Sequence, residues 1–184
     1  MGFAGISEIS RERIRRAGEK IKEDHADELQ NRGTSLDVGF RAFKLADTNF
    51  TKWRTESDID ATELERHLFD LRESADDNAT PDDLLTEILI KQGHSLVEQV
   101  RDRVIDGLSY KAVVRVDEED GNEEMLVLAY LDEHTTPSLT QLRDAVETKP
   151  VQFIMLEDAF KGDDELKTNL AQMCKTNGVE FWTA

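Results

Sequence analysis

The stretch of sequence that decides the fold is residues 97–132, VEQVRDRVIDGLSYKAVVRVDEEDGNEEMLVLAYLD. Three segments in it, at 97–105, 109–117 and 124–132, alternate or run apolar in the way of β-strands. The turn-forming sequences DGLS and EEDGNE separate these segments. Turns of this kind between strands predict hairpins, so we expect an antiparallel meander of three strands.

Downstream of the meander, helical and strand patterns alternate. PSLTQLRDAVETK at 137–149 and DDELKTNLAQMCKTNG at 163–178 have the apolar spacing of helices, and Gly178 is the expected stop for the second. PVQFIMLED at 150–158 has the composition of a buried strand, and VEFWT at 179–183 that of a closing strand. Helices alternating with late strands predict an α/β fold, here with a mixed sheet.

The amino-terminal part begins with a long polar helix, predicted over residues 7–32. Ser7 or Ser10 is the expected cap of this helix, and Gly33 is its expected stop. Its apolar positions form a stripe that is thin for a helix of this length. We therefore expect the helix to pack on a partner, either another part of the protein or a second copy.

Three more elements are predicted before the meander. LDVGFRAFKLA at 36–46 has the pattern of a strand that enters a core, and helices are expected at 61–74 and 81–93. Thr80 followed by Pro81 marks the start of the last helix, and Gly93 marks its end. The fold class is then α/β, with a long N-terminal helix followed by a mixed β-sheet domain with flanking helices. The expected division is a helical segment at 1–33 and an α/β domain at 34–184.

Composition restricts the classes of function. The chain of 184 residues has a formal net charge of −17, which opposes a free-standing domain that grips nucleic acid phosphates. No apolar run approaches the roughly 20 residues that cross a bilayer, so we expect no membrane contact and a cytoplasmic location. The single cysteine, Cys174, is expected to be a core thiol.

Motifs for catalysis or cofactor binding are missing from the sequence. It contains no GxGxxG or GxxxxGK[ST] loop, no HExxH and no CxxC pair, and its four histidines are scattered. We therefore predict no catalytic, cofactor-binding or metal-binding residues in this chain. One alternative stays open, a small enzyme that acts through the loop around Lys161, although the acidic residues after that loop favour a structural role.

Two sets of residues on the first predicted helix are candidate contacts. The first is the one basic concentration in the sequence, expected to meet phosphates or an acidic partner, or else to be a solvated, salt-bridged surface: Arg11, Arg13, Arg15, Arg16, Lys20 and Lys22. The second is the apolar stripe, expected to face a partner: Ile9, Ile14, Ala17 and Ile21.

Four segments carry a resemblance to a known family: GISEISRERIRRAGEKIKED, LDVGFRAFKLADTNFTKW, TPDDLLTEILIKQG and LEDAFKGDDELKTNLAQMCKTNGVEFWT. In this order and spacing they resemble the carboxy-terminal portion of the adenine-specific DNA methyltransferase (Mod) subunit of type III restriction-modification systems. The resemblance extends over nearly the whole chain. It implies that residues 1–33 are the edge of the methyltransferase catalytic domain and that residues 34–184 are the C-terminal domain of Mod.

The resemblance also implies what the chain lacks. Methyltransferases of that family place the flipped adenine with a DPPY-type motif and bind S-adenosylmethionine with an FxGxG-type motif, and this sequence contains neither. The implied role is a non-catalytic assembly or dimerisation module. Its implied partners are the remainder of the methyltransferase, a second Mod copy and the restriction (Res) subunit, with DNA reached through the full complex. The alternatives are a free-standing protein–protein interaction module, a small enzyme of unknown chemistry, or an acidic mimic of DNA.

Overall fold

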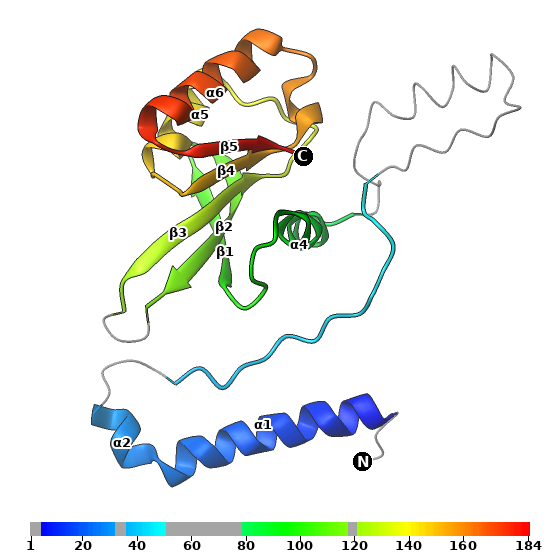
Figure 1. Cartoon of the computed structure of the whole chain (residues 1–184), viewed down its shortest axis with the longest axis vertical. Coiled ribbons are helices and arrows are strands. Elements are labelled where there is room, and N and C mark those ends of the chain that lie inside the picture. The colour runs from blue at the N-terminus through cyan, green and yellow to red at the C-terminus, as the bar shows by residue number, and fades with distance from the viewer. Residues whose placement is uncertain (1–4, 32–35, 51–78, 118–120) are drawn as a thin grey trace, which may run out of the picture. The chain divides into compact units, whose positions relative to one another are not determined.

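The computed structural model describes residues 5–31, 36–50, 79–117 and 121–184. The chain divides into two compact units (Figure 1). We call residues Met1–Leu45 with Asp117–Asn122 the helical unit, and residues Ala46–Val116 with Glu123–Ala184 the sheet unit. In the described ranges, no helix is long and apolar enough to cross a membrane.

The sheet unit contains one five-stranded sheet whose strands lie in the order of the chain. Its strands are β1 (Gln99–Ile105), β2 (Leu108–Val116), β3 (Glu123–Tyr130), β4 (Gln152–Met155) and β5 (Glu180–Thr183). β1, β2 and β3 form the expected antiparallel meander, and β3, β4 and β5 pair in parallel. The predicted α/β class with a mixed sheet is therefore confirmed.

The turn between β1 and β2 explains why the meander forms where the sequence predicts it. Ile105 pairs with Leu108, so only Asp106 and Gly107 lie between the strands. Both have positive φ, 44° and 79°, as a type I′ turn requires. Such a turn matches the right-handed twist of the strands, and it fixes the register of the hairpin.

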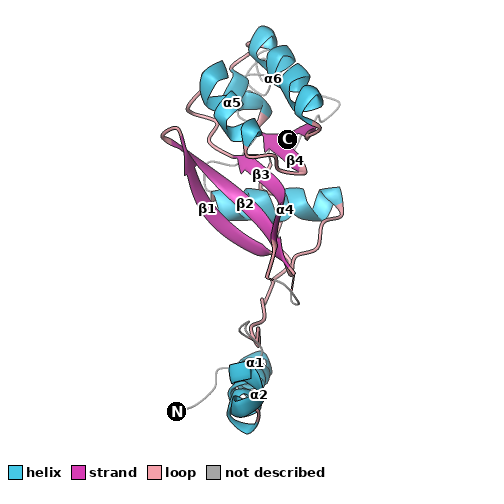
Figure 2. Cartoon of the chain, turned by 90° about the vertical axis from the view of Figure 1, so that its left-hand side faces the viewer, coloured by secondary structure: helices cyan, strands magenta, loops and turns pink. Residues whose placement is uncertain are grey.

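Helices cover both faces of the sheet. The helices α5 (Leu139–Glu147) and α6 (Asp164–Asn177) lie together on one face, and α4 (Pro81–Gln92) lies on the other (Figures 1 and 2). Side-chain alternation agrees with this arrangement, because Lys111 of β2 makes an ion pair of 2.8 Å with Asp82 of α4. Its strand neighbour Tyr110 lies on the α5 and α6 face, where its ring centroid is 6.2 Å from that of Phe153.

The core of the sheet unit is continuous and apolar on both faces of the sheet. All four residues of β4 are buried, as expected for a central strand covered on both sides. The largest fully buried side chains come from three strands, β2, β3 and β4, and from the helices α4, α5 and α6: Tyr110, Leu128, Tyr130, Phe153, Ile154, Met155, Leu85, Ile88, Leu142 and Leu170, with Leu156 and Phe160 after β4.

Local sequence signals cap the α-helices of the sheet unit that the structure describes. The Thr80 side chain and Asp83 form a capping box at the start of α4, with Pro81 in the first turn, and Gly93 ends the helix at φ 77°. At the end of α6, Gly178 has φ 71°. The structure confirms these predicted boundaries. They could be predicted because each depends on a local sequence signal.

The N-terminal helix of the helical unit differs from the prediction in two respects. The single helix expected over residues 7–32 is two helices, α1 (Ile6–Asp24) and α2 (Ala26–Asn31), with a break at His25. The expected serine cap is also wrong, because Gly5 precedes α1 and no side chain caps it. The expected stop, Gly33, lies outside the described residues.

The strand predicted over residues 36–46 does not form. This segment is extended but belongs to no strand, and its Phe43 and Leu45 side chains are exposed. A local contact explains the difference, because the Asp37 carboxylate accepts a hydrogen bond of 2.7 Å from the backbone N–H of Gly39. Such a turn competes with sheet pairing. The helix predicted over 61–74 lies outside the described residues.

Candidate interaction surface

The long helix α1 is stabilised mainly by contacts within its own sequence. Good helix formers fill most of its 19 positions, with Glu8 in the first turn and Lys22 in the last, where their charges suit the helix dipole. Glu12 pairs with Arg16 at 2.8 Å and with Arg15 at 3.7 Å. Surface pairs of this kind add only a few tenths of a kcal/mol each.

One close contact fixes the extended segment Leu36–Leu45, which we call the strap, against α1. Gly18 is the buried residue of α1, and a Cβ atom placed on it would lie 3.0 Å from the Cβ of Val38. A side chain at position 18 would therefore push Val38 away. The Arg15 guanidinium carbon also lies 5.8 Å from the centroid of the Phe40 ring, within the range of a cation–π contact.

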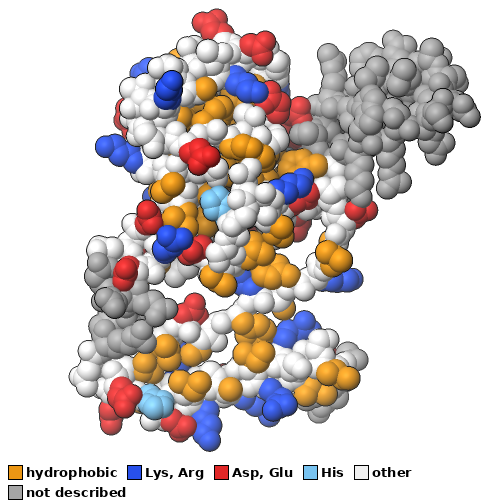
Figure 3. Space-filling model, in the orientation of Figure 1, with side chains coloured by type: hydrophobic (Ala, Val, Ile, Leu, Met, Phe, Trp, Pro, Cys, Tyr) orange, Lys and Arg blue, Asp and Glu red, His pale blue; other side chains and the backbone are white. Residues whose placement is uncertain are grey.

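The apolar stripe of α1 is exposed in the structure. Ile9, Ile14 and Ile21 are 43%, 48% and 46% exposed, and Ile6, one turn before Ile9, is 84% exposed. Ala17 is exposed as well. Figure 3 shows hydrophobic side chains at the surface of the helical unit, with Lys and Arg side chains beside them. Four isoleucines on one helix, three of them about half exposed and Ile6 almost fully exposed, form a surface whose burial against a partner would be favourable.

The six candidate cations do not form one patch. They alternate along α1 with five acidic residues, and Arg15 and Arg16 are engaged with Glu12. Among the described residues, no ion pair joins Arg13, Lys20 or Lys22 to a carboxylate. Arg13 also has no acidic residue three or four positions away, so it faces solvent beside Ile9 and Ala17.

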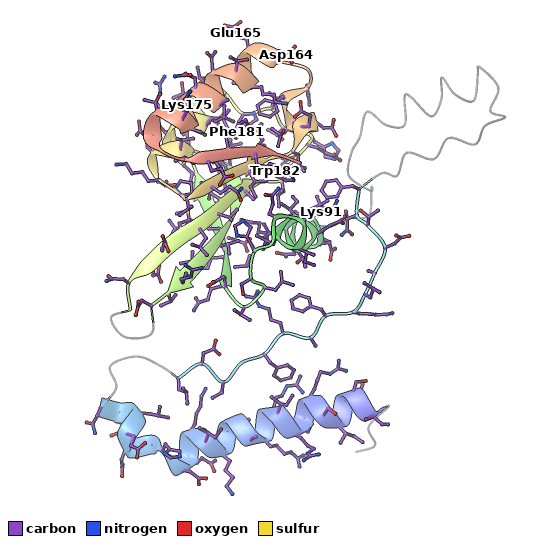
Figure 4. All side chains as sticks on the ribbon, in the orientation of Figure 1. Lys91, Asp164, Glu165, Lys175, Phe181 and Trp182 are labelled. Carbon is purple, nitrogen blue, oxygen red and sulfur yellow. The ribbon has the colours of Figure 1, made fainter. Side chains whose placement is uncertain are left out.

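The loop around Lys161, the alternative site, is used for packing. Lys161 donates a hydrogen bond of 2.6 Å to the backbone carbonyl of His134, and Lys167 pairs with Glu157 at 2.6 Å. Asp164 and Glu165 occupy the first turn of α6 (Figure 4), where their negative charges interact favourably with the positive end of the helix dipole. Both lysines are thus committed to partners within the fold.

Two other reactive residue types have structural positions. Cys174 is buried, as predicted, and burial raises the pKa of its thiol to about 11. A thiol with that pKa is a poor nucleophile near neutral pH. Within the described ranges, no group of three or more His, Cys, Asp or Glu residues could hold a metal ion.

A polar anchor that the sequence did not predict holds residues 48–50 on α4. The Glu87 carboxylate, 15% exposed, accepts hydrogen bonds from the Thr48 hydroxyl and from the Asn49 backbone N–H, the latter at 2.6 Å. Lys91 binds the same carboxylate at 2.8 Å and lies 4.5 Å from the centroid of the Phe50 ring (Figure 4). We call this set, Thr48, Asn49, Phe50, Glu87 and Lys91, the anchor.

The anchor changes the acidity of its central carboxyl group. Burial on its own raises the pKa of Glu87, but hydrogen bonds from Lys91, Thr48 and the Asn49 backbone outweigh it. The charge of Lys91 adds to their effect, so the pKa falls from an ordinary value of 4.5 to about 2. The ionised carboxylate therefore stabilises the anchor at neutral pH.

Comparison with known proteins gives no family for this chain. No family model matches it, and no curated protein matches it. Among solved structures, it is similar to the catalytic core domain of HTLV-2 integrase, described in complex with magnesium in a dimeric form, with 16% identity and a TM-score of 0.20. The match covers 47% of this chain and 57% of that one, and at this TM-score it supports no inference about the present chain. The fold defines the class, an α/β protein with a separate helical unit.

Proposed function

We propose that this chain is the non-catalytic carboxy-terminal portion of a type III adenine-specific DNA methyltransferase, the Mod subunit of a restriction-modification system. In this proposal the helical unit docks on the remainder of the methyltransferase, and the chain contributes to assembly with a second Mod copy and with the Res subunit. S-adenosylmethionine binds in the catalytic portion, and DNA is reached through the full complex. The proposed compartment is the cytoplasm.

The exposed apolar stripe of α1 is the observation on which the proposal rests. Ile9, Ile14 and Ile21 lie on one helix and are each between two fifths and one half exposed. Covering such a side chain fully contributes on the order of 1.5–3 kcal/mol relative to full exposure, so covering the rest of each contributes about 1 kcal/mol. Several such side chains together support a stable contact.

The loop around Lys161 does not favour the enzyme alternative. An amine that acts on a substrate must be free to react with it, whereas the Lys161 amine donates a hydrogen bond to the His134 carbonyl and the Lys167 amine pairs with Glu157. The DNA-mimic alternative is weakened by the alternation of acidic and basic residues along α1, because a mimic would need ordered acidic rows with few cations.

Co-expression tests the proposal directly. The chain is produced together with the amino-terminal portion of a type III Mod protein that carries the DPPY and FxGxG motifs. We expect the two to co-purify and to methylate adenine in duplex DNA, with Ile14→Asp and Ile21→Asp each weakening association about tenfold or more. Gln30→Asp, which adds the same charge to an exposed site in α2, serves as the matched control.

Two outcomes would overturn the proposal. One is failure of the two portions to associate when both are folded. The other is association that Ile14→Asp and Ile21→Asp leave unchanged relative to Gln30→Asp. Calorimetric titration of the chain alone should also give no heat of binding for S-adenosylmethionine, and micromolar binding would contradict the proposed division of labour.

A further inference from the structure

The charges of α1 are sorted around the helix. Glu8, Glu12, Glu19 and Glu23 follow one another at spacings of four, seven and four residues, so they form a single acidic row. Ile14, Ala17 and Ile21 follow at three and four residues and form the apolar stripe on a different face. Four of the five acids of α1 therefore lie on a different face from Ile14, Ala17 and Ile21, whereas the fifth, Asp24, lies three residues after Ile21.

The border of the apolar stripe is cationic. Arg13 lies four residues after Ile9 and four before Ala17, and Lys20 lies three residues after Ala17. Side chains at these spacings are neighbours on a helix. Both cations are exposed, and neither has an ion-pair partner among the described residues. In a chain with 40 acidic residues and 23 basic ones, two cations left beside an apolar stripe suit an acidic partner.

The same border disfavours pairing of two α1 helices. In an antiparallel pair, equivalent flanks face each other, which would place Arg13 and Lys20 of one copy against the same residues of the other. In a parallel pair, the flank with Arg13 and Lys20 would meet the other flank of the second copy. That flank carries Arg11, a further cation, and Val38 of the strap packs there on Gly18. Like charges in both arrangements reduce the stability of the pair.

We infer that the stripe of α1 binds a protein surface whose apolar groove is bordered by carboxylates, and that it does not bind a second copy of α1. Ile14, Ala17 and Ile21 enter the groove, and Arg13 with Lys20 pair with the carboxylates at its edge. This deepens the proposed function, since it rests on the claim that the helical unit docks a partner and states the chemistry of that partner.

A small acidic groove fits better than an extended anionic surface. A lipid bilayer or a DNA duplex is an extended anionic surface, and the chain's net charge of −17 opposes its approach. A groove that contacts only α1 meets a helix with six cations and five acids, sorted so that the cations nearest the stripe make the contact. Charge complementarity is thus local to this face.

A charge-swap experiment on the full chain tests the inference. Two fluorescent helical peptides share one leucine stripe, and the stripe is bordered by glutamates in the first and by lysines in the second. We expect the glutamate peptide to bind about tenfold more tightly at low salt, with the preference shrinking as ionic strength rises from about 0.05 to about 0.5 M. Anisotropy measures both affinities.

Substitutions assign the preference to the cationic border. Arg13→Glu with Lys20→Glu should invert the order of the two peptides, and Arg13→Gln with Lys20→Gln should abolish it. Arg143→Glu with Lys175→Glu makes the same change in net charge at exposed positions of the sheet unit and should keep the wild-type order. Far-ultraviolet circular dichroism verifies that each variant keeps its helix content.

Several results would overturn the inference: equal binding of both peptides, no binding of either, or an inversion produced equally by the control pair. Tight binding to anionic vesicles or duplex DNA that needs Arg13 and Lys20 would also overturn it, as would self-association that Ile14→Asp abolishes. If the charge swap succeeds but co-expression fails, only the methyltransferase assignment falls. If co-expression succeeds without a charge preference, only this inference falls.

Discussion

The two units of this chain hold their conformations in different ways. In the sheet unit, large apolar side chains from both faces of the sheet are fully buried, and three capped helices cover them. In the helical unit, Gly18 is the buried residue of α1 while its isoleucines are exposed. Burial thus stabilises the first unit internally, and it leaves the second with apolar surface available for a partner.

The largest expected effect contrasts one substitution in each unit. Phe153→Ala should lower the free energy of unfolding of the sheet unit by about 3–5 kcal/mol, because it leaves a cavity among fully buried residues. Ile14→Ala should change the stability of the isolated chain by less than about 0.5 kcal/mol, because that side chain is half exposed. Urea unfolding measures the change in the free energy of unfolding for both variants. Similar changes would show that the two units are stabilised in the same way.

Next in size is the effect of the anchor. Glu87→Gln removes the charge that Lys91 binds, and we expect a loss of about 1–3 kcal/mol in the free energy of unfolding of the sheet unit. Since the folded-state pKa of about 2 lies below the ordinary 4.5, ionised Glu87 stabilises the fold above about pH 4.5. This contribution is lost as the pH falls toward 2.

The pH dependence separates the charge from the shape of the side chain. The difference in stability between the wild type and Glu87→Gln should be constant above about pH 5 and should shrink between about pH 4.5 and 2. Urea unfolding at several pH values measures this difference. A difference that does not vary over that range would show that the carboxylate charge plays no part in the anchor.

A smaller effect is expected at the contact between α1 and the strap. Gly18→Ala gains about 1 kcal/mol of helix propensity but brings a methyl group to 3.0 Å from the Cβ of Val38. We expect the helix to gain stability while the strap loses its contact, seen as faster hydrogen exchange and faster proteolysis at residues 36–45. Adding Val38→Ala should restore protection of the strap, and unchanged protection in Gly18→Ala would refute the close contact.

The smallest effect concerns the surface ion pairs. Arg16→Ala should cost only about 0.3–0.5 kcal/mol of α1 stability, because its ion pair with Glu12 is exposed and water solvates both charges well when the pair is broken. Circular dichroism at low and high salt should show that this loss decreases with ionic strength. A loss above about 1 kcal/mol would mean that this pair holds the helical unit together.

Elements with a local sequence signal were predicted well. The alternation at 97–132, the buried strand at 150–158 and the stop at Gly178 each depend on residues within one element, and each is confirmed. The close approach of Gly18 to Val38 and the anchor of Thr48 on Glu87 join residues far apart in sequence, so no periodicity predicts them. An isolated glycine inside a helical pattern was the one available sign of the first.

The candidate surface was predicted in part. The exposure of Ile14 and Ile21 agrees with a thin stripe, whereas their contact with a partner stays a prediction. The six cations appeared in the sequence as one concentration, and the structure divides them, since Arg15 and Arg16 share Glu12 while Arg13 borders the stripe. Sequence spacing shows which residues are neighbours on a helix, but it does not show which of the available ion pairs form.

The order of strands in the sheet has a consequence for biosynthesis. Each strand pairs with the strand that precedes it in the chain, so the sheet grows in one direction from β1 to β5. A ribosome that releases the chain from its amino terminus supplies the strands in that same order, and each new strand meets an edge that already exists. Each strand from β2 to β5 therefore meets a partner that is already synthesised, which shortens the time that an unpaired edge is exposed to other chains.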